Sequence, residues 1–193
     1  MSGRTESQNI GYRVSATFDL DARFPGQVFR NDVGESLFCE FDAVLTPDFW
    51  PALSAMARWH DDDHVDLLVL PDGDELTECT AVSLPVEASE DDYWASIGFE
   101  PDGDALGSIA IAAKVVAVTG RSGKWGCWGE RDPEIAVFRG FPSDAARDEW
   151  RDRFGPFLET RGALRSYLPP TFAGRIVPDE YAASLTSNYG AVG

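Results

Sequence analysis

The sequence predicts one α+β domain, in which about three helices pack on a mainly antiparallel sheet. Three observations support this fold class. Strand patterns mostly follow one another along the 193 residues, helical patterns interrupt them without regular βαβ alternation, and no linker separates two regions. A chain of this length can bury a proper core, so we expect residues 1–193 to form a single domain.

The N-terminal part predicts a disordered end and then two strands. Residues 1–10 are polar, which is typical of a disordered terminus. Residues 12–20 alternate apolar and polar side chains, the period-2 pattern of a half-buried strand. Residues 36–45 show the same alternation and predict the second strand.

The next elements are a helix and two strands. Thr46-Pro47-Asp48 is a strong helix start, since it combines a capping hydroxyl, a first-turn proline and an acid near the positive end of the helix dipole. Apolar residues at helical spacing then predict a helix over 47–59. Residues 64–70 predict a short buried strand, and 77–86 another with alternating side chains.

The region from Ser89 predicts a helix and the longest strand. Ser89 followed by acids has the form of a capping box, and Gly98 ends the short helix that it begins. Residues 108–119 are rich in Ile, Val and Ala, so we expect a long strand there.

The C-terminal third predicts a hairpin, a helix and an irregular arm. Residues 125–130 and 134–139 read as two strands joined by a tight turn. Ser143 caps a helix that Gly155-Pro156 ends. Residues 169–193 are rich in Pro, Gly and Ser and predict an irregular arm.

The charge is distributed unevenly. Residues 1–113 carry 23 acidic and five basic side chains, whereas residues 114–193 carry 10 and 11. No Lys or Arg lies between Arg58 and Lys114, a span with 15 acidic residues. Such a field repels nucleic acid and anionic membranes and attracts basic proteins or cations. We therefore expect a basic protein partner, no nucleic acid and no membrane. A GC-rich genome or a high-salt cytoplasm would also produce an acidic surface without a specific partner.

The compartment predicted is the cytoplasm. The sequence holds no apolar stretch long enough to span a membrane, and its first residues lack the apolar core of a signal peptide. Cys39, Cys79 and Cys127 are odd in number and widely spaced, which indicates buried thiols in a reducing environment. No cofactor is predicted.

Both histidines lie in one acidic loop, His60-Asp61-Asp62-Asp63-His64. Imidazole and carboxylate groups are ligands for zinc, manganese or iron, so His60 and His64 are candidate metal ligands. Five consecutive residues rarely all face one point, and a solvated acidic turn explains the same pattern.

Two repeated turns and one glycine-rich loop add no catalytic motif. Pro-Asp-Gly-Asp occurs at 71–74 and 101–104, and it predicts turns because proline presets φ and glycine supplies positive φ. Residues 120–124 have the wrong glycine spacing for a phosphate-binding loop. No serine or cysteine has an evident base, so the sequence favours a role other than catalysis.

Two tryptophans mark the least ordinary segment. Trp125 and Trp128, with glycines between them, either pack a tight sheet corner or form an exposed aromatic platform. Residues 124–138 contain a Trp-Gly…Glu-Arg-Asp-x-Glu-hydrophobic pattern. This pattern resembles small uncharacterised actinobacterial proteins and immunity proteins of bacterial toxin systems. The resemblance implies an intracellular acidic binder without enzymatic activity, and it transfers no site residues.

Three hypotheses follow. The first is an acidic cytoplasmic binding protein, of the immunity or inhibitor kind, that neutralises a basic protein partner. The second is a metal-dependent enzyme that uses the loop from His60 to His64, and the third is an accessory protein whose acidity has no specific partner. For the first, the expected contact residues are the following: Asp61, Asp62, Asp63, Asp91, Asp92, Trp125 and Trp128.

Overall fold

The computed structural model describes residues 2–31, 34–70 and 80–190. Its centre is a six-stranded sheet with strand order β1-β6-β5-β4-β2-β3, and every neighbouring pair is antiparallel. The α+β class and the antiparallel sheet are confirmed. The strands are β1 (Leu37–Glu40), β2 (His64–Leu70), β3 (Thr80–Pro85), β4 (Val115–Gly120), β5 (Gly126–Glu130) and β6 (Ile135–Arg139).

The expectation of about three helices was too low, because the described residues form eight α-helices and five short 3-10 helices. The α-helices are α1 (Ser2–Thr17), α2 (Phe41–Val44), α3 (Trp50–Trp59), α4 (Glu90–Ile97), α5 (Ile109–Ala112), α6 (Asp144–Phe154), α7 (Thr160–Ser166) and α8 (Asp179–Tyr189). The 3-10 helices are η1 (Pro47–Phe49), η2 (Pro101–Gly103), η3 (Ala105–Gly107), η4 (Pro169–Thr171) and η5 (Ala173–Arg175).

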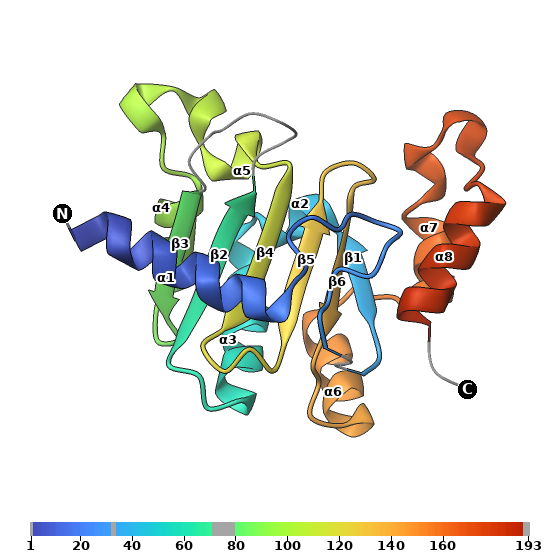
Figure 1. Cartoon of the computed structure of the whole chain (residues 1–193), viewed down its shortest axis with the longest axis horizontal. Helices are drawn as coiled ribbons and strands as arrows, with labels where there is room; N and C mark the ends of the chain where they lie inside the picture. Colours follow the sequence, from blue (N-terminus) through green and yellow to red (C-terminus); the bar gives the residue numbers. More distant parts are fainter. Residues whose placement is uncertain (1, 32–33, 71–79, 191–193) are drawn as a thin grey trace.

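Helices cover both faces of the sheet. In β4, Val116 and Val118 belong to one hydrophobic cluster, with α3 and α6. The alternate residues Val115 and Ala117 belong to the other cluster, with α1 and α8. Figure 1 shows α1 crossing in front of the sheet and α3 behind it. Because successive strand side chains point to opposite faces, an all-apolar strand needs cover on both.

Where local signals were strong, the predicted elements are confirmed. Residues 47–59 form η1 and α3, and residues 64–70 form β2. Ser89 and Asp92 make both hydrogen bonds of a capping box at the start of α4. Ser143 accepts a hydrogen bond from the Ala146 N–H at the start of α6.

The strand predicted over 12–20 was wrong, because most of this segment belongs to α1. This helix also includes most of residues 1–10, which were expected to be disordered. Val14 and Phe18 lie four residues apart, so they fit both a strand and a helix face. Burial distinguishes the two, since Ile10 and Val14 are buried while Tyr12 is exposed.

The long strand predicted over 108–119 is also wrong in its first half. Residues 109–112 form α5, and β4 begins only at Val115. The Arg131 guanidinium donates hydrogen bonds to the carbonyls of Ala110 and Ala113, at the end of this short helix. The partner that satisfies these carbonyls lies far along the chain, so local propensity could not reveal the helix. The strand predicted over 36–45 likewise ends at Glu40, where α2 begins.

The C-terminal arm is more regular than expected. Within 169–190 the chain forms η4, η5 and the three-turn helix α8. Leu185 and Tyr189 of α8 are buried at i, i+4 spacing, so this helix is part of the core. Figure 1 shows α7 and α8 together at one end of the sheet.

Candidate functional site

The two histidines of the acidic loop serve different contacts. His60 Nε2 lies 2.6 Å from the Gly140 carbonyl oxygen, which follows β6. His64 begins β2, and its Nδ1 lies 3.2 Å from Asp63 Oδ1. The neighbouring His64 imidazole holds the pKa of the Asp63 carboxyl below its usual range, and Arg121 adds to this effect.

Asp62, between them, points into the protein. Its carboxylate accepts hydrogen bonds from the Trp125 indole N–H at 2.9 Å, from the Ser122 hydroxyl at 2.9 Å and from the Ser122 backbone N–H. A Cβ at Gly120 would overlap this carboxylate, so β4 must end in a glycine here. Asp62 therefore joins the loop to the β4–β5 turn and is not a surface contact.

The structure does not assemble the metal site suggested by His60 and His64. Among the residues that it describes, no group of three or more His, Cys, Asp or Glu side chains could hold a metal ion. The two imidazoles approach a carbonyl and an exposed carboxylate. This geometry gives the second hypothesis no support.

The two predicted tryptophan anchors lie in the core. Trp125 and Trp128 have no exposed surface. The Trp125 indole contacts Asp62, and the Trp128 indole donates a 2.8 Å hydrogen bond to Glu130. Their role as partner contacts is therefore wrong for this folded state, and the tight sheet corner is the correct alternative.

The remaining predicted contacts are exposed. Asp61 and Asp63 lie at the surface of the loop, and Asp91 and Asp92 lie in the first turn of α4. Hydrogen bonds from the Ser89 backbone N–H and hydroxyl hold the pKa of Asp92 below its usual range. Asp92 thus remains an anion while it caps the helix.

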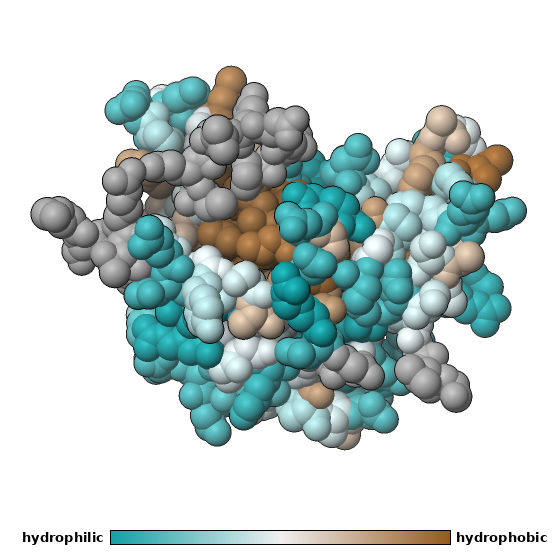
Figure 2. All heavy atoms as spheres, in the orientation of Figure 1, coloured by the Kyte–Doolittle hydropathy of each residue, from teal (hydrophilic) through white to brown (hydrophobic). Residues whose placement is uncertain are grey.

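A surface that the sequence analysis missed adjoins Asp91 and Asp92. We call residues 90–112, which run from α4 through η2 and η3 to α5, the acidic lobe. The lobe exposes large apolar side chains: Trp94 (47% exposed), Phe99 (67%), Leu106 (70%) and Ile111 (50%). Figures 1 and 2 show the part of this lobe around η2 and η3 projecting at the upper left, with apolar and hydrophilic atoms side by side.

Helix periodicity could have identified part of this surface. Tyr93 and Ile97 are four residues apart and buried, so they define the inner face of α4. Trp94 follows Tyr93 by one residue and falls on the outer side. Phe99 lies in the loop after α4 and Leu106 in the three-residue helix η3, and both segments are too short for periodicity to indicate the direction of a side chain.

The carboxylates of the acidic lobe have no basic partner among the described residues. The lobe carries Glu90, Asp91, Asp92, Glu100, Asp102 and Asp104, and it has no Lys or Arg. Within the described part of the chain, no basic nitrogen lies within 4.0 Å of these carboxylates. The acids of α6 differ, because Asp144 and Asp148 pair with Arg147, and Asp148 pairs also with Arg151.

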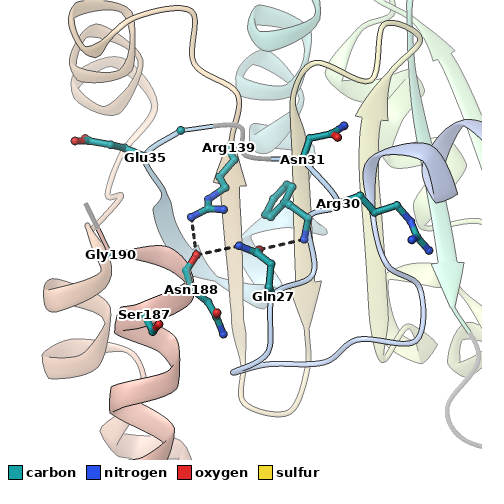
Figure 3. A pocket seen from close by; sticks show the side chains of 10 residues that line it. Gln27, Arg30, Asn31, Glu35, Arg139, Ser187, Asn188 and Gly190 are labelled. Carbon is teal, nitrogen blue, oxygen red and sulfur yellow. Dashed lines mark hydrogen bonds between the residues drawn. The ribbon is translucent and has the colours of Figure 1, made fainter. Parts of the chain in front are cut away.

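The cavity in Figure 3 lies between α8, β6 and the segment before β1, and its volume is about 450 Å³. Arg139 from β6 donates a 2.7 Å hydrogen bond to the Asn188 carbonyl, which also accepts one from the Gln27 side chain at 3.1 Å. The Arg139 guanidinium lies over the rings of Phe29 and Tyr189. These contacts hold α8 against the sheet, so the cavity lies where α8 packs on the sheet and its polar groups serve this packing.

Glu130, the last residue of β5, carries a buried carboxylate. It accepts hydrogen bonds from the Trp128 indole and from the Phe24 backbone N–H. Burial raises the pKa of the Glu130 carboxyl, although both hydrogen bonds favour the anion.

Similarity to known proteins does not indicate a function for this chain. In the described part of the chain, no helix has the length and apolar character needed to cross a membrane. No family model matches the chain, and neither a curated protein nor a solved structure matches it significantly.

Proposed function

We propose that this chain is an acidic cytoplasmic binding protein that neutralises a basic protein partner, as an immunity or inhibitor protein does. The observation that carries the proposal is the acidic lobe, which combines four exposed apolar side chains with six carboxylates that pair with no basic group among the described residues.

The two kinds of side chain have complementary roles in association. Exposed aromatic residues supply contact area, and tryptophan is enriched among residues that dominate binding energy. Unpaired carboxylates attract a basic surface over several ångströms and accelerate the encounter. Charge neutralised by internal ion pairs would contribute little to either effect. The lobe keeps its charge available, in contrast to α6.

The lobe also accounts for the selection of partners. A surface that is both acidic and apolar repels anions and binds more tightly to a partner that carries cationic and apolar groups together. A basic protein that binds nucleic acid presents such groups in its cleft. Masking that cleft would neutralise the partner without any chemistry in the acidic lobe.

The test compares two charge variants of equal net charge. The lobe variant is Glu90→Gln/Asp91→Asn/Glu100→Gln, and the control variant is Asp152→Asn/Asp179→Asn/Glu180→Gln, which changes exposed acids elsewhere. Each protein is immobilised and exposed to lysate of the source cells at low salt, and retained proteins are identified by mass spectrometry. We expect wild type and control to retain the same basic protein, and the lobe variant to lose it.

Salt provides a second readout. Because exposed charges are screened within about 10 Å at 0.1 M salt, retention should fall steeply as salt rises. Retention of no basic protein at low salt, or equal retention by both variants, would contradict the proposed function.

A further inference from the structure

The two edges of the sheet are treated differently. At one edge, Leu158 pairs with β1, since Phe38 and Leu158 exchange two backbone hydrogen bonds of 2.7 and 2.9 Å. At the other edge, no strand in the described part of the chain pairs with the outer side of β3. Figure 1 shows β3 as the outermost strand on the left.

The pairing register shows which β3 groups point outward. Val86 lies opposite Asp63 and donates a 3.0 Å hydrogen bond to its carbonyl, so this pair is hydrogen-bonded. Hydrogen-bonded and non-hydrogen-bonded pairs alternate along antiparallel strands. Ala81 and Ser83 therefore belong to non-hydrogen-bonded pairs, and their backbone N–H and C=O groups point away from β2.

These outward groups meet no protein partner in the residues that the structure describes. Natural edge strands are commonly protected by charges, prolines or bulges. The β3 sequence Thr-Ala-Val-Ser-Leu-Pro contains no charged residue. Its only proline, Pro85, occupies the next outward position after Ser83, so it ends the open edge there and leaves the outward groups of Ala81 and Ser83 available for pairing.

The open edge leads into an acidic groove. A shallow hollow of about 570 Å³ lies between the end of β3 and α4. Its lining includes the apolar side chains of Leu84 and Ala95 together with the carboxylates of Glu87 and Asp92. A chain extended along β3 could thus place cationic side chains beside these carboxylates.

We propose that β3 is the docking edge for an extended, Lys- or Arg-containing segment of the partner, which adds to the sheet as a seventh strand. The inference rests on the proposed function and specifies how the partner binds. Backbone hydrogen bonds to Ala81 and Ser83 give the pairing, and Glu87 with Asp92 selects for positive charge. A second copy of this chain is a poor occupant, because each copy carries a net charge of −17.

The probe is a synthetic hexapeptide of alternating Lys and Val with blocked ends. Its control is the same peptide N-methylated at every second residue, in both possible phases, which removes backbone donors and keeps the charge. Binding is followed by NMR at low salt, and hydrogen exchange is measured at the amides of β3. The protein variants are Ala81→Pro, which removes one outward N–H, and Ala81→Ser, which keeps it.

We expect the unmodified peptide to slow exchange at Ala81 and Ser83, and one methylation phase to abolish binding. Ala81→Pro should weaken binding about tenfold, while Ala81→Ser should leave it within about twofold. Urea unfolding of both variants checks that the fold is retained. No binding, binding without protection of these amides, or equal binding by a folded Ala81→Pro protein would each overturn the inference.

The Ala81→Pro protein also separates the two proposals. If it retains the basic protein in the capture experiment while the lobe variant loses it, strand addition fails and the proposed function stands. If wild type retains no basic protein, the proposed function itself fails.

Discussion

The buried Asp62 carboxylate accepts a 2.9 Å hydrogen bond from the Trp125 indole, across 63 positions of sequence. Asp62 and Trp125 were both expected to contact a partner at the surface, but here they contact each other inside the protein. This contact fastens the loop after α3 to the turn between β4 and β5.

Asp62→Ala should destabilise the protein by about 3 kcal/mol, because the Trp125 and Ser122 donors would then be buried without an acceptor. Urea unfolding measures the change. Asp63→Ala removes a neighbouring exposed acid and should leave the midpoint almost unchanged. Equal effects of the two substitutions would show that the hydrogen bonds of Asp62 do not contribute to the free energy of unfolding.

Arg13→Ala should be similarly costly, by about 3–5 kcal/mol. Arg13 of α1 donates to the fully buried Asp66 carboxylate of β2, which also accepts from the Ser83 hydroxyl. Without Arg13, the charge on Asp66 stays buried and uncompensated. The Arg13→Ala/Asp66→Ala double variant should lose less than the sum of the single variants, and strict additivity in urea unfolding would refute the coupling.

Glu130 should give the stability a measurable pH dependence. Because the pKa of the folded-state carboxyl is raised above its ordinary value of 4.5, the folded state holds this proton more tightly than the unfolded chain. The contribution of Glu130 to stability should therefore fall as pH rises from about 4.5 through the raised pKa. Thermal unfolding of wild type and Glu130→Gln across pH 4–8 tests this expectation. If the wild type instead became more stable relative to Glu130→Gln as the pH rises, the expectation would be contradicted.

Trp94 should matter for binding and not for folding. Trp94→Ser removes an exposed aromatic side chain from the acidic lobe, so we expect at least about tenfold weaker affinity for the captured basic partner. Titration calorimetry measures the affinity. Ile176→Ser is the matched control, since Ile176 is 73% exposed and lies outside the lobe. A similar loss of affinity in both variants would indicate nonspecific hydrophobic binding.

Local chemistry determined a large part of the fold. Ser89 and Ser143 cap helices as their sequence context predicts, and β2 lies where its apolar run indicates. Cys39 and Cys127 are buried free thiols, as expected, whereas Cys79 and the turn at 71–74 lie outside the described residues. Capping and periodicity act over a few residues, which is why the sequence alone reveals them.

Tertiary structure decided the elements whose patterns fit two periods or depend on distant partners. Residues 10–17 pack as a helix because Val14 contacts the apolar face of the sheet and Arg13 pairs with Asp66. Residues 109–112 turn into a helix whose end is met by Arg131. The residues that stabilise these two helices lie far away in the sequence, so local patterns could not predict the helices.

The same division applies to the candidate site. That one long span is acidic and free of basic residues follows directly from the amino-acid order, because charge is a property of composition. The inward direction of Asp62, the burial of Trp125 and Trp128 in the core and the exposure of Leu106 became visible only in the folded protein. The physical reason is that burial depends on which distant surfaces meet, and those contacts are formed only by the folded sheet and its two layers of helices.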